Sequence, residues 1–108
     1  MPIANKGTVR SLMQRTLALL RLHAPEVPAV TLPEQRVLDA YFGDGYGHAT
    51  PAGRIATARA QELEGLKLDP TYTAKAFACL LAYVRGGQLS ETSTVVFWHT
   101  GGLPGLFA

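Results

Sequence analysis

Residues 94–102 read TVVFWHTGG and give the clearest indication of fold class in the chain. Residues 94–99 are β-branched and aromatic without polar alternation, which is typical of a strand covered on both faces. The Thr-Gly-Gly turn that follows and a short helical segment over 103–108 complete a strand–turn–helix unit. In an open α/β sheet, such a unit exposes backbone N–H groups to a ligand at the end of the strand.

The rest of the chain is too short to complete such a sheet. The chain has 108 residues, enough for one small domain, and it offers at most three short strands, over 35–39, 66–68 and 94–99. The sequence therefore predicts an α/β architecture, a partial open parallel sheet with helices. We expect residues 1–108 to form a single incomplete domain of a larger fold, with residues 1–8 flexible.

The first expected helix, over 8–24, is also the basic part of the chain. Apolar residues recur there at three- and four-residue steps, and Pro25 ends the helix. Residues 1–25 contain four basic side chains and no acidic one, whereas the remainder has six basic and eight acidic side chains. An ordinary surface helix with a basic outer face and an organelle transit peptide both match this pattern. With no secretory pattern, we expect a cytoplasmic location. The predicted buried face consists of Val9, Leu12, Met13, Leu17, Leu20 and Ala24.

Two further helices are expected from their caps. A Thr-Pro pair at 50–51 places an N-cap hydroxyl before a proline at the first helical position, and Gly65 can close that helix in a left-handed conformation. An Asp-Pro pair at 69–70 repeats the device, and the helix that follows runs to about Arg85, where the glycines at 86–87 stop it. The predicted buried stripe of this last helix consists of Phe77, Leu80, Leu81 and Val84.

Composition excludes several classes of protein. Hydrophobic residues make up 47 % of the chain and charged residues 17 %, so disorder does not fit, and no apolar run is long enough for a membrane span. Cys79 alone cannot form a disulfide framework and is typical of a core thiol. The spaced cations lack interleaved aromatics, which makes a poor nucleic-acid surface. The histidines at 23, 48 and 99 lack metal-ligand spacing.

The low charge content also bears on partners. It is well below the usual quarter of residues, so we expect more apolar surface than a free monomer tolerates. The sequence therefore predicts self-association, or a homo-oligomer, through exposed apolar surface.

A loop over 41–48 reads YFGDGYGH and carries the first candidate site residue. Packing alone seldom requires glycine at this density, because glycine permits turns and close approaches that other residues do not. Tyr46 lies between two glycines, and Tyr72 lies in the first turn after the Asp-Pro cap. Each phenol either faces a cleft or packs structurally.

Four motifs, in order along the chain, resemble one family. They are GYG at 45–47, TP at 50–51, EGLKLDPTYTAKA at 64–76 and HTGGLP at 99–104. Together they resemble the C-terminal third of the pyridoxal-phosphate-dependent D-cysteine desulfhydrases and 1-aminocyclopropane-1-carboxylate deaminases, which have the tryptophan-synthase-β-like fold (fold type II). The resemblance covers approximately residues 9–108.

The resemblance implies roles for five residues. The tyrosines that match Tyr46 and Tyr72 lie over the cofactor and assist at the amino or carboxylate end of the substrate. The residue that matches Thr73 faces the pyridine nitrogen. The deaminases have a glutamate there, so a threonine favours the desulfhydrase reaction, a β-elimination that gives pyruvate, ammonia and sulfide. Thr100 and Gly101 are expected beside the cofactor ring.

The same resemblance implies that parts of the cofactor site are missing. In the family, the Schiff-base lysine, the phosphate-binding loop and a substrate-binding serine precede the matching region. Lys6, Lys67 and Lys75 are the only lysines, and Lys75 matches a helix lysine of the family, while Ala74 replaces a glycine. Pyridoxal 5′-phosphate and a small amino-acid substrate are therefore expected in the complete enzyme and not on this chain alone.

We interpret the chain as the C-terminal part of a D-cysteine desulfhydrase-like lyase that is inactive by itself. Two alternatives stay open: a deaminase-like enzyme, and a non-catalytic remnant or partner-binding module.

Overall fold

The chain consists of two compact units, which are described separately. The computed structural model describes residues 6–33, 38 and 40–101. One unit covers Met1–Asp39 and the other Ala40–Ala108. The predicted helical segment over 103–108 lies outside the described residues, as does, apart from Leu38, the predicted strand over 35–39. Of residues 1–8, which are expected to be flexible, 1–5 also lie outside the described residues, and 6–8 form the start of a helix.

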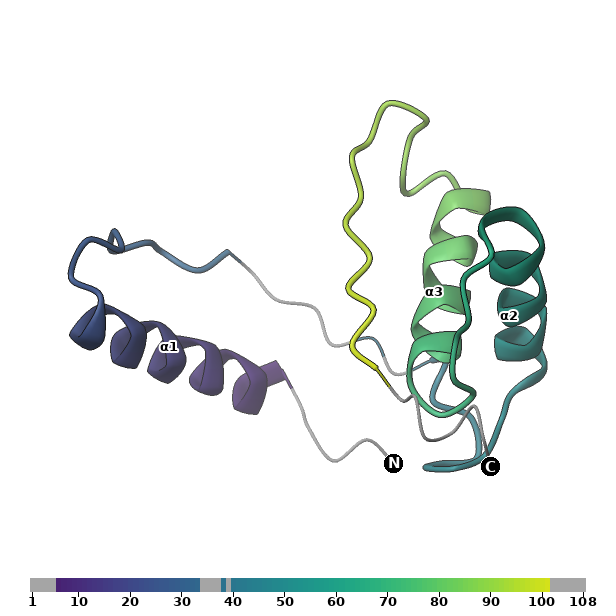
Figure 1. Cartoon of the computed structure of the whole chain (residues 1–108), viewed down its shortest axis with the longest axis horizontal. Helices are drawn as coiled ribbons and strands as arrows, with labels where there is room; N and C mark the ends of the chain where they lie inside the picture. Colours follow the sequence, from purple (N-terminus) through teal and green to yellow (C-terminus); the bar gives the residue numbers. More distant parts are fainter. Residues whose placement is uncertain (1–5, 34–37, 39, 102–108) are drawn as a thin grey trace. The chain divides into compact units, whose positions relative to one another are not determined.

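Three helices make up the regular secondary structure of the described residues (Figure 1). Helix α1 spans Lys6–His23, α2 spans Pro51–Glu64 and α3 spans Thr73–Arg85. All three predicted helices are thus confirmed, with small differences at their ends. None of these helices combines the length and the apolar character that a membrane span requires.

The predicted α/β architecture is wrong, because the described part of the chain contains no β-strand or sheet. Residues 94–99 are extended, but their backbone forms no hydrogen bond with another described segment. Side chains hold this segment instead. The ring of Phe97 lies edge-on to that of Phe77 with centroids 5.2 Å apart, and His99 Nε2 lies 2.8 Å from the carbonyl oxygen of Lys67. A strand forms only against a hydrogen-bonding neighbour. Residues 66–68, likewise, are an irregular connection and not a strand.

The unit Met1–Asp39 consists of α1 and a returning segment. The helix ends before Pro25, as predicted, and the chain then runs back along it. Two basic side chains of α1 hold the returning segment against the helix. The Arg10 guanidinium donates a hydrogen bond to the carbonyl of Pro33 at 3.0 Å, and Arg21 Nε donates to the carbonyl of Val27 at 3.1 Å. Part of the basic charge of α1 therefore serves the internal structure of this unit.

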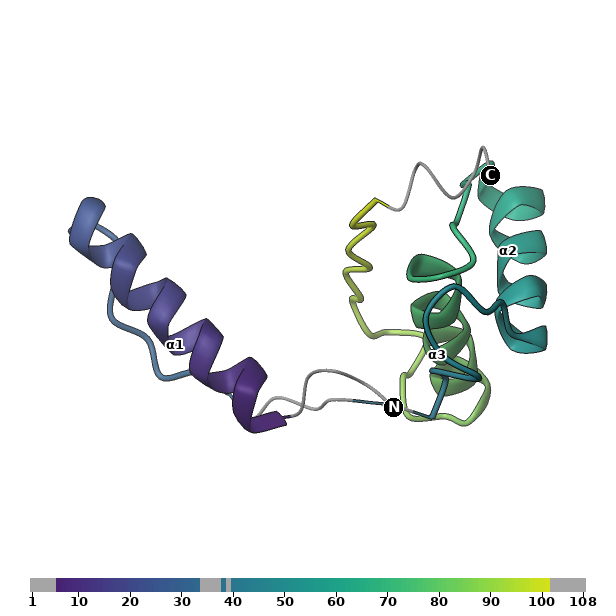
Figure 2. The ribbon, with the colours of Figure 1, turned by 90° about the horizontal axis from the view of Figure 1, so that it is seen from below.

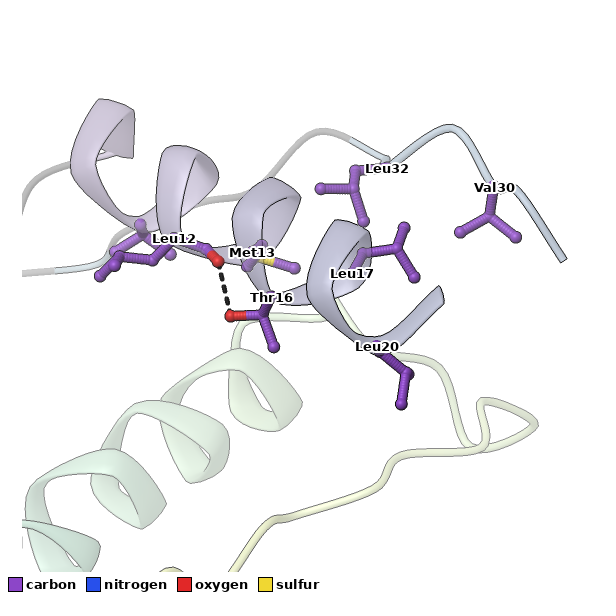
Figure 3. A pocket seen from close by; sticks show the side chains of 8 residues that line it. Leu12, Met13, Thr16, Leu17, Leu20, Val30 and Leu32 are labelled. Atoms are coloured by element: carbon purple, nitrogen blue, oxygen red, sulfur yellow. Dashed lines mark hydrogen bonds between the residues drawn. The ribbon is translucent and has the colours of Figure 1, made fainter. Parts of the chain in front are cut away.

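The apolar face of α1 is open, so the prediction that it is buried is wrong within this unit. Leu12 is 52 % exposed and Leu20 is 49 % exposed. The returning segment is too short to cover the helix, and it leaves an apolar groove of about 450 Å³ (Figure 3). The groove is lined by Val9, Leu12, Met13, Thr16, Leu17, Leu20, Val30 and Leu32.

In the unit Ala40–Ala108, α2 and α3 lie side by side and run in the same direction (Figures 1 and 2). Small residues form their contact, which lets the helix axes approach closely. A Cβ added at Gly53 would lie 3.6 Å from Cβ of Ala74. The core cluster consists of Ala60, Leu68 and Ala74, with Phe77 and Phe97 packed against it.

The buried face of α3 therefore differs from the predicted stripe. Its fully buried residues include Ala74 and Ala78, which face this contact. Phe77, Leu80 and Leu81 are only half-buried, and Val84 is 54 % exposed. Periodicity identifies an apolar stripe, but the partner that covers the stripe decides its burial.

Both ends of α2 have the predicted caps. Thr50 Oγ1 accepts a hydrogen bond from the backbone N–H of Gly53 at 3.0 Å, and Pro51 occupies the first turn. At the other end, Gly65 has φ +65°, and its N–H donates to the carbonyl of Gln61 at 3.0 Å. This left-handed conformation costs glycine no steric strain.

Candidate functional site

Two tyrosines that are far apart in the sequence meet on the surface of the unit Ala40–Ala108. The ring centroids of Tyr46 and Tyr72 are 5.8 Å apart with an interplanar angle of 65°, an edge-to-face arrangement that aromatic quadrupoles favour. Tyr46 is 75 % exposed and Tyr72 is 51 % exposed. The structure thus brings together the two residues expected at the substrate, while their catalytic role stays a prediction.

The contact with Tyr46 also affects the acidity of Tyr72. The adjacent Tyr46 side chain raises the pKa of the Tyr72 phenol above its ordinary value of 10.0, and desolvation and the charge of Asp69 add to the shift. A raised phenol pKa means that the protonated form is stabilised. At neutral pH Tyr72 therefore holds its proton and is suited to donate a hydrogen bond, not to act as a base.

The buried carboxylate of Asp69 sets the backbone position of Tyr72. Asp69 is 1 % exposed. Its Oδ2 accepts hydrogen bonds from the backbone N–H groups of Thr71 at 2.9 Å and Tyr72 at 2.7 Å, and its Oδ1 accepts from the N–H of Thr73 at 3.0 Å. These amides precede the first intrahelical hydrogen bonds of α3 and need an acceptor. The predicted Asp-Pro cap is therefore confirmed only in part. The Asp69 carboxylate accepts these hydrogen bonds, but Pro70 lies in a turn, and α3 begins at Thr73 with Tyr72 at its N-cap position.

The hydrogen bonds to Asp69 also determine its charge. Burial by itself raises the pKa of the carboxyl group, but the hydrogen bonds from Thr73, Tyr72 and Thr71 outweigh that effect and lower the pKa from its ordinary value of 3.8. Asp69 is consequently ionised at neutral pH, which strengthens each of these bonds.

Thr73 is buried and uses its hydroxyl group within the chain. It is 2 % exposed, and its hydroxyl donates to Asp69 Oδ1 at 2.7 Å while accepting from the backbone N–H of Asp69 at 2.9 Å. A threonine hydroxyl has one proton and two acceptor positions, so one acceptor position remains. The contact with a pyridine nitrogen implied by the resemblance stays a prediction. Because the hydroxyl proton is already donated to Asp69, Thr73 can only accept a hydrogen bond there, from a protonated pyridine nitrogen.

The other two expected site residues are not linked to this cluster. Thr100 is exposed, and Gly101 has φ +117° at the end of the extended C-terminal segment. Neither forms a hydrogen bond with Tyr46, Tyr72 or Thr73 within the described structure. In the structure the two tyrosines are therefore in direct contact, and Thr73 is connected to Tyr72 through Asp69, which binds both residues.

Among the described residues, the other reactive side chains form no cluster that indicates chemistry. Cys79 is half-buried in α3, in agreement with a packing role. In the part of the chain that the structure describes, no three His, Cys, Asp or Glu side chains lie close enough together to hold a metal ion.

Comparison with curated proteins places these residues in a known context. The chain is 35 % identical over 94 residues, or 87 % of its length, to D-cysteine desulfhydrases of Salmonella newport (strain SL254), Salmonella heidelberg (strain SL476) and Salmonella enteritidis PT4 (strain P125109). This chain matches the C-terminal part of these desulfhydrases. It spans 29 % of their length. No family model matches the chain. The resemblance inferred from the four motifs is confirmed by the identity to the desulfhydrases.

The described residues do not by themselves fit pyridoxal phosphate. The cofactor requires a lysine for its aldehyde and donors for its phosphate. Lys75 is 7 % exposed, and its Nζ donates to the carbonyl of Gly45 at 3.0 Å, so its ammonium group is already bound. The phenols of the desulfhydrase-like region can contact a substrate, and Thr73 has one free lone pair. No described residue is therefore assigned to hold the cofactor.

Sequence reasoning misses two residues of this region. It predicts Asp69 only as a cap. The signal that it misses is the hydroxyl of Thr73 four residues later, because this spacing lets the Asp69 carboxylate bind both the backbone N–H and the side chain of Thr73. It identifies Lys75 only as a helix lysine of the family and gives it no role. The alanines on either side of Lys75 are the available signal that this lysine lies on a buried helical face.

Proposed function

We propose that this chain forms the C-terminal part of a pyridoxal-phosphate-dependent lyase that acts on D-cysteine. In this reaction D-cysteine and water give pyruvate, ammonia and hydrogen sulfide. The observation that carries the proposal is the pair of Tyr46 and Tyr72. Two accessible phenols meet in a region that is similar to the desulfhydrases, and one of them keeps its proton at neutral pH.

The two phenols have distinct tasks in this proposal. Tyr72 donates a hydrogen bond to the substrate, at its carboxylate or at the leaving sulfur, because its proton is retained. Tyr46 holds the Tyr72 ring in place through their edge-to-face contact. Pyridoxal phosphate, when bound, withdraws electrons from the substrate Cα. We propose that residues outside those described hold it, so the isolated chain is inactive.

Two alternatives differ from this proposal in specific residues. A deaminase-like enzyme acting on 1-aminocyclopropane-1-carboxylate requires an acidic group at the pyridine nitrogen, and the neutral hydroxyl of Thr73 argues against it. A non-catalytic remnant or partner-binding module is favoured by a different observation, the open apolar groove on α1.

A graft tests the proposal. Residues 9–108 replace the matching C-terminal part of a Salmonella D-cysteine desulfhydrase, which restores the cofactor-binding part. Release of both pyruvate and sulfide from D-cysteine, and of neither from L-cysteine, is the expected result. Ammonia from 1-aminocyclopropane-1-carboxylate without sulfide from D-cysteine identifies a deaminase. A folded, cofactor-loaded graft that is inactive on both substrates supports the non-catalytic module and contradicts the proposal.

We also propose that the isolated chain self-associates. The apolar groove on α1 and the exposed Val96 and Trp98, which are 80 % and 79 % exposed, support this proposal, since monomers rarely expose large apolar patches. Light scattering on the purified chain should give a mass above that of a monomer, increasing with concentration. Leu12→Glu and Leu20→Glu should reduce the mass, with Leu63→Glu on α2 as a control. A monomer at all concentrations would exclude self-association.

A further inference from the structure

Lys75 is a charged side chain that is almost completely buried in the described structure. It lies near the start of α3 and is 7 % exposed. No carboxylate of the described residues forms an ion pair with it. A buried ammonium is costly unless other groups replace the water that it loses. Its partners therefore indicate what this lysine does.

Both partners of Lys75 belong to the glycine-rich loop. Its Nζ donates a hydrogen bond to the carbonyl oxygen of Gly45 at 3.0 Å. The same Nζ lies 5.6 Å from the centroid of the Phe42 ring, which is within the range of a cation–π interaction. The lysine thus connects α3 to one loop through a hydrogen bond and an aromatic face.

The carbonyl that Lys75 binds is the one that controls Tyr46. The Gly45 carbonyl belongs to the peptide group that leads into Tyr46. It also accepts a hydrogen bond from the N–H of His48 at 3.1 Å, which closes a turn around Tyr46 and Gly47. Fixing this one oxygen therefore fixes the direction in which the Tyr46 side chain leaves the loop.

Without such an anchor, little would hold the loop in one conformation. Gly43, Gly45 and Gly47 have φ values of +69°, +119° and +79°, and glycine has more accessible conformations than any other residue. The exposed ring of Tyr46 is not held by burial. The contact of Tyr46 with Tyr72 must then depend on what holds the backbone of the loop. Lys75 is placed to hold it, because Lys75 lies about one helical turn after Tyr72 and binds the Gly45 carbonyl.

We propose that Lys75 is a positioning residue, whose ammonium group anchors the Gly45 carbonyl and so holds the Tyr46 phenol against Tyr72. Its significance for catalysis rests on the proposed function, but the positioning itself is a property of this chain. The lysine acts through the loop and does not touch the substrate.

Nuclear magnetic resonance on the full chain at neutral pH tests the positioning directly. The wild-type chain should give through-space cross-peaks between the ring protons of Tyr46 and Tyr72. Lys75→Met, which keeps the length of the side chain and removes its charge and donors, should abolish them while the α2 and α3 signals persist. Lys75→Arg should restore them. Lys67→Met, which removes an exposed lysine outside the loop, should leave them unchanged.

The possible outcomes separate the positioning from the function. Cross-peaks that persist in Lys75→Met overturn the proposal. If Lys75→Met does not fold, cross-peaks between the Lys75 Hε and Gly45 Hα protons of the wild-type chain decide instead, and their absence overturns it.

Activity in the graft gives the second measurement. Lys75→Met should lower turnover on the order of 10²-fold, the scale of a misplaced catalytic group. It should add little to Tyr46→Phe, because both changes take the Tyr46 hydroxyl group away from its position beside Tyr72. Full additivity contradicts the proposal. If Lys75→Met loses the cross-peaks while the graft with the wild-type sequence has no desulfhydrase activity, the positioning stands and only the proposed function is contradicted.

Discussion

Replacing Tyr72 with phenylalanine in the grafted enzyme should lower turnover of D-cysteine by roughly 10²- to 10⁴-fold, the usual contribution of a positioned proton donor. The substitution removes one hydroxyl group and keeps the ring that meets Tyr46 edge-on. Because only a hydroxyl group is removed, the content of bound cofactor should not change. Steady-state kinetics with D-cysteine and spectrophotometric determination of bound cofactor measure the two effects separately.

Matched controls remove the same groups elsewhere. Tyr41→Phe deletes a phenol hydroxyl from a half-buried tyrosine outside the pair and should leave turnover within a factor of about two, as is usual for a residue that is remote from the chemistry. Cys79→Ala should affect stability more than turnover, whereas His23→Ala, at an exposed residue that the sequence suggests as a packing residue, should change neither by much. An essential Cys79 with a dispensable Tyr72 would contradict the roles that we assign.

The second large effect concerns stability. Asp69→Ala should lower the free energy of unfolding of the chain on the order of 2–3 kcal/mol, because it leaves three backbone N–H groups and the Thr73 hydroxyl without their acceptor. The backbone around Tyr72 should loosen with it. Urea unfolding followed by far-ultraviolet circular dichroism, at neutral pH and low protein concentration, measures the loss.

The effect of Asp69 should depend on pH in a defined direction. Its pKa in the folded chain is lowered from 3.8, so the stabilisation is complete above about pH 5 and is lost as pH falls through the folded pKa. The stability difference between wild type and Asp69→Ala should therefore shrink on acidification. Asp69→Asn, which keeps one acceptor, should lose less stability and be less sensitive to pH. A difference that grows toward low pH contradicts an ionised cap.

The elements that sequence predicts well are those that depend on neighbours in the chain. Thr50 and Gly65 cap α2 through hydrogen bonds within a few residues, so their residue types are sufficient evidence. Residues 94–99 are different, since a strand requires a partner segment, and the described chain provides none. The same reason explains why α1 has the predicted period but not the predicted burial.

The candidate site divides in the same way. The resemblance to a family singles out Tyr46 and Tyr72, and the structure brings the two rings together although 26 positions separate them in sequence. Asp69 and Lys75 hold other residues in position. They bind mainly backbone groups, and the type of a residue does not reveal which backbone group it binds. The Lys75 contact with Gly45 joins two segments whose approach is decided only by the folded chain.

The extended segment 94–101 has a consequence for how its order is observed. Phe97 and His99 hold it in place, yet the backbone amides of 94–98 form no hydrogen bond with another described segment. Amide hydrogen exchange reports hydrogen bonding and opening, not position. These amides can thus exchange as rapidly as those of an unfolded peptide while the segment keeps its place. Fixed geometry and slow exchange, which accompany each other in helices and sheets, are separate properties here.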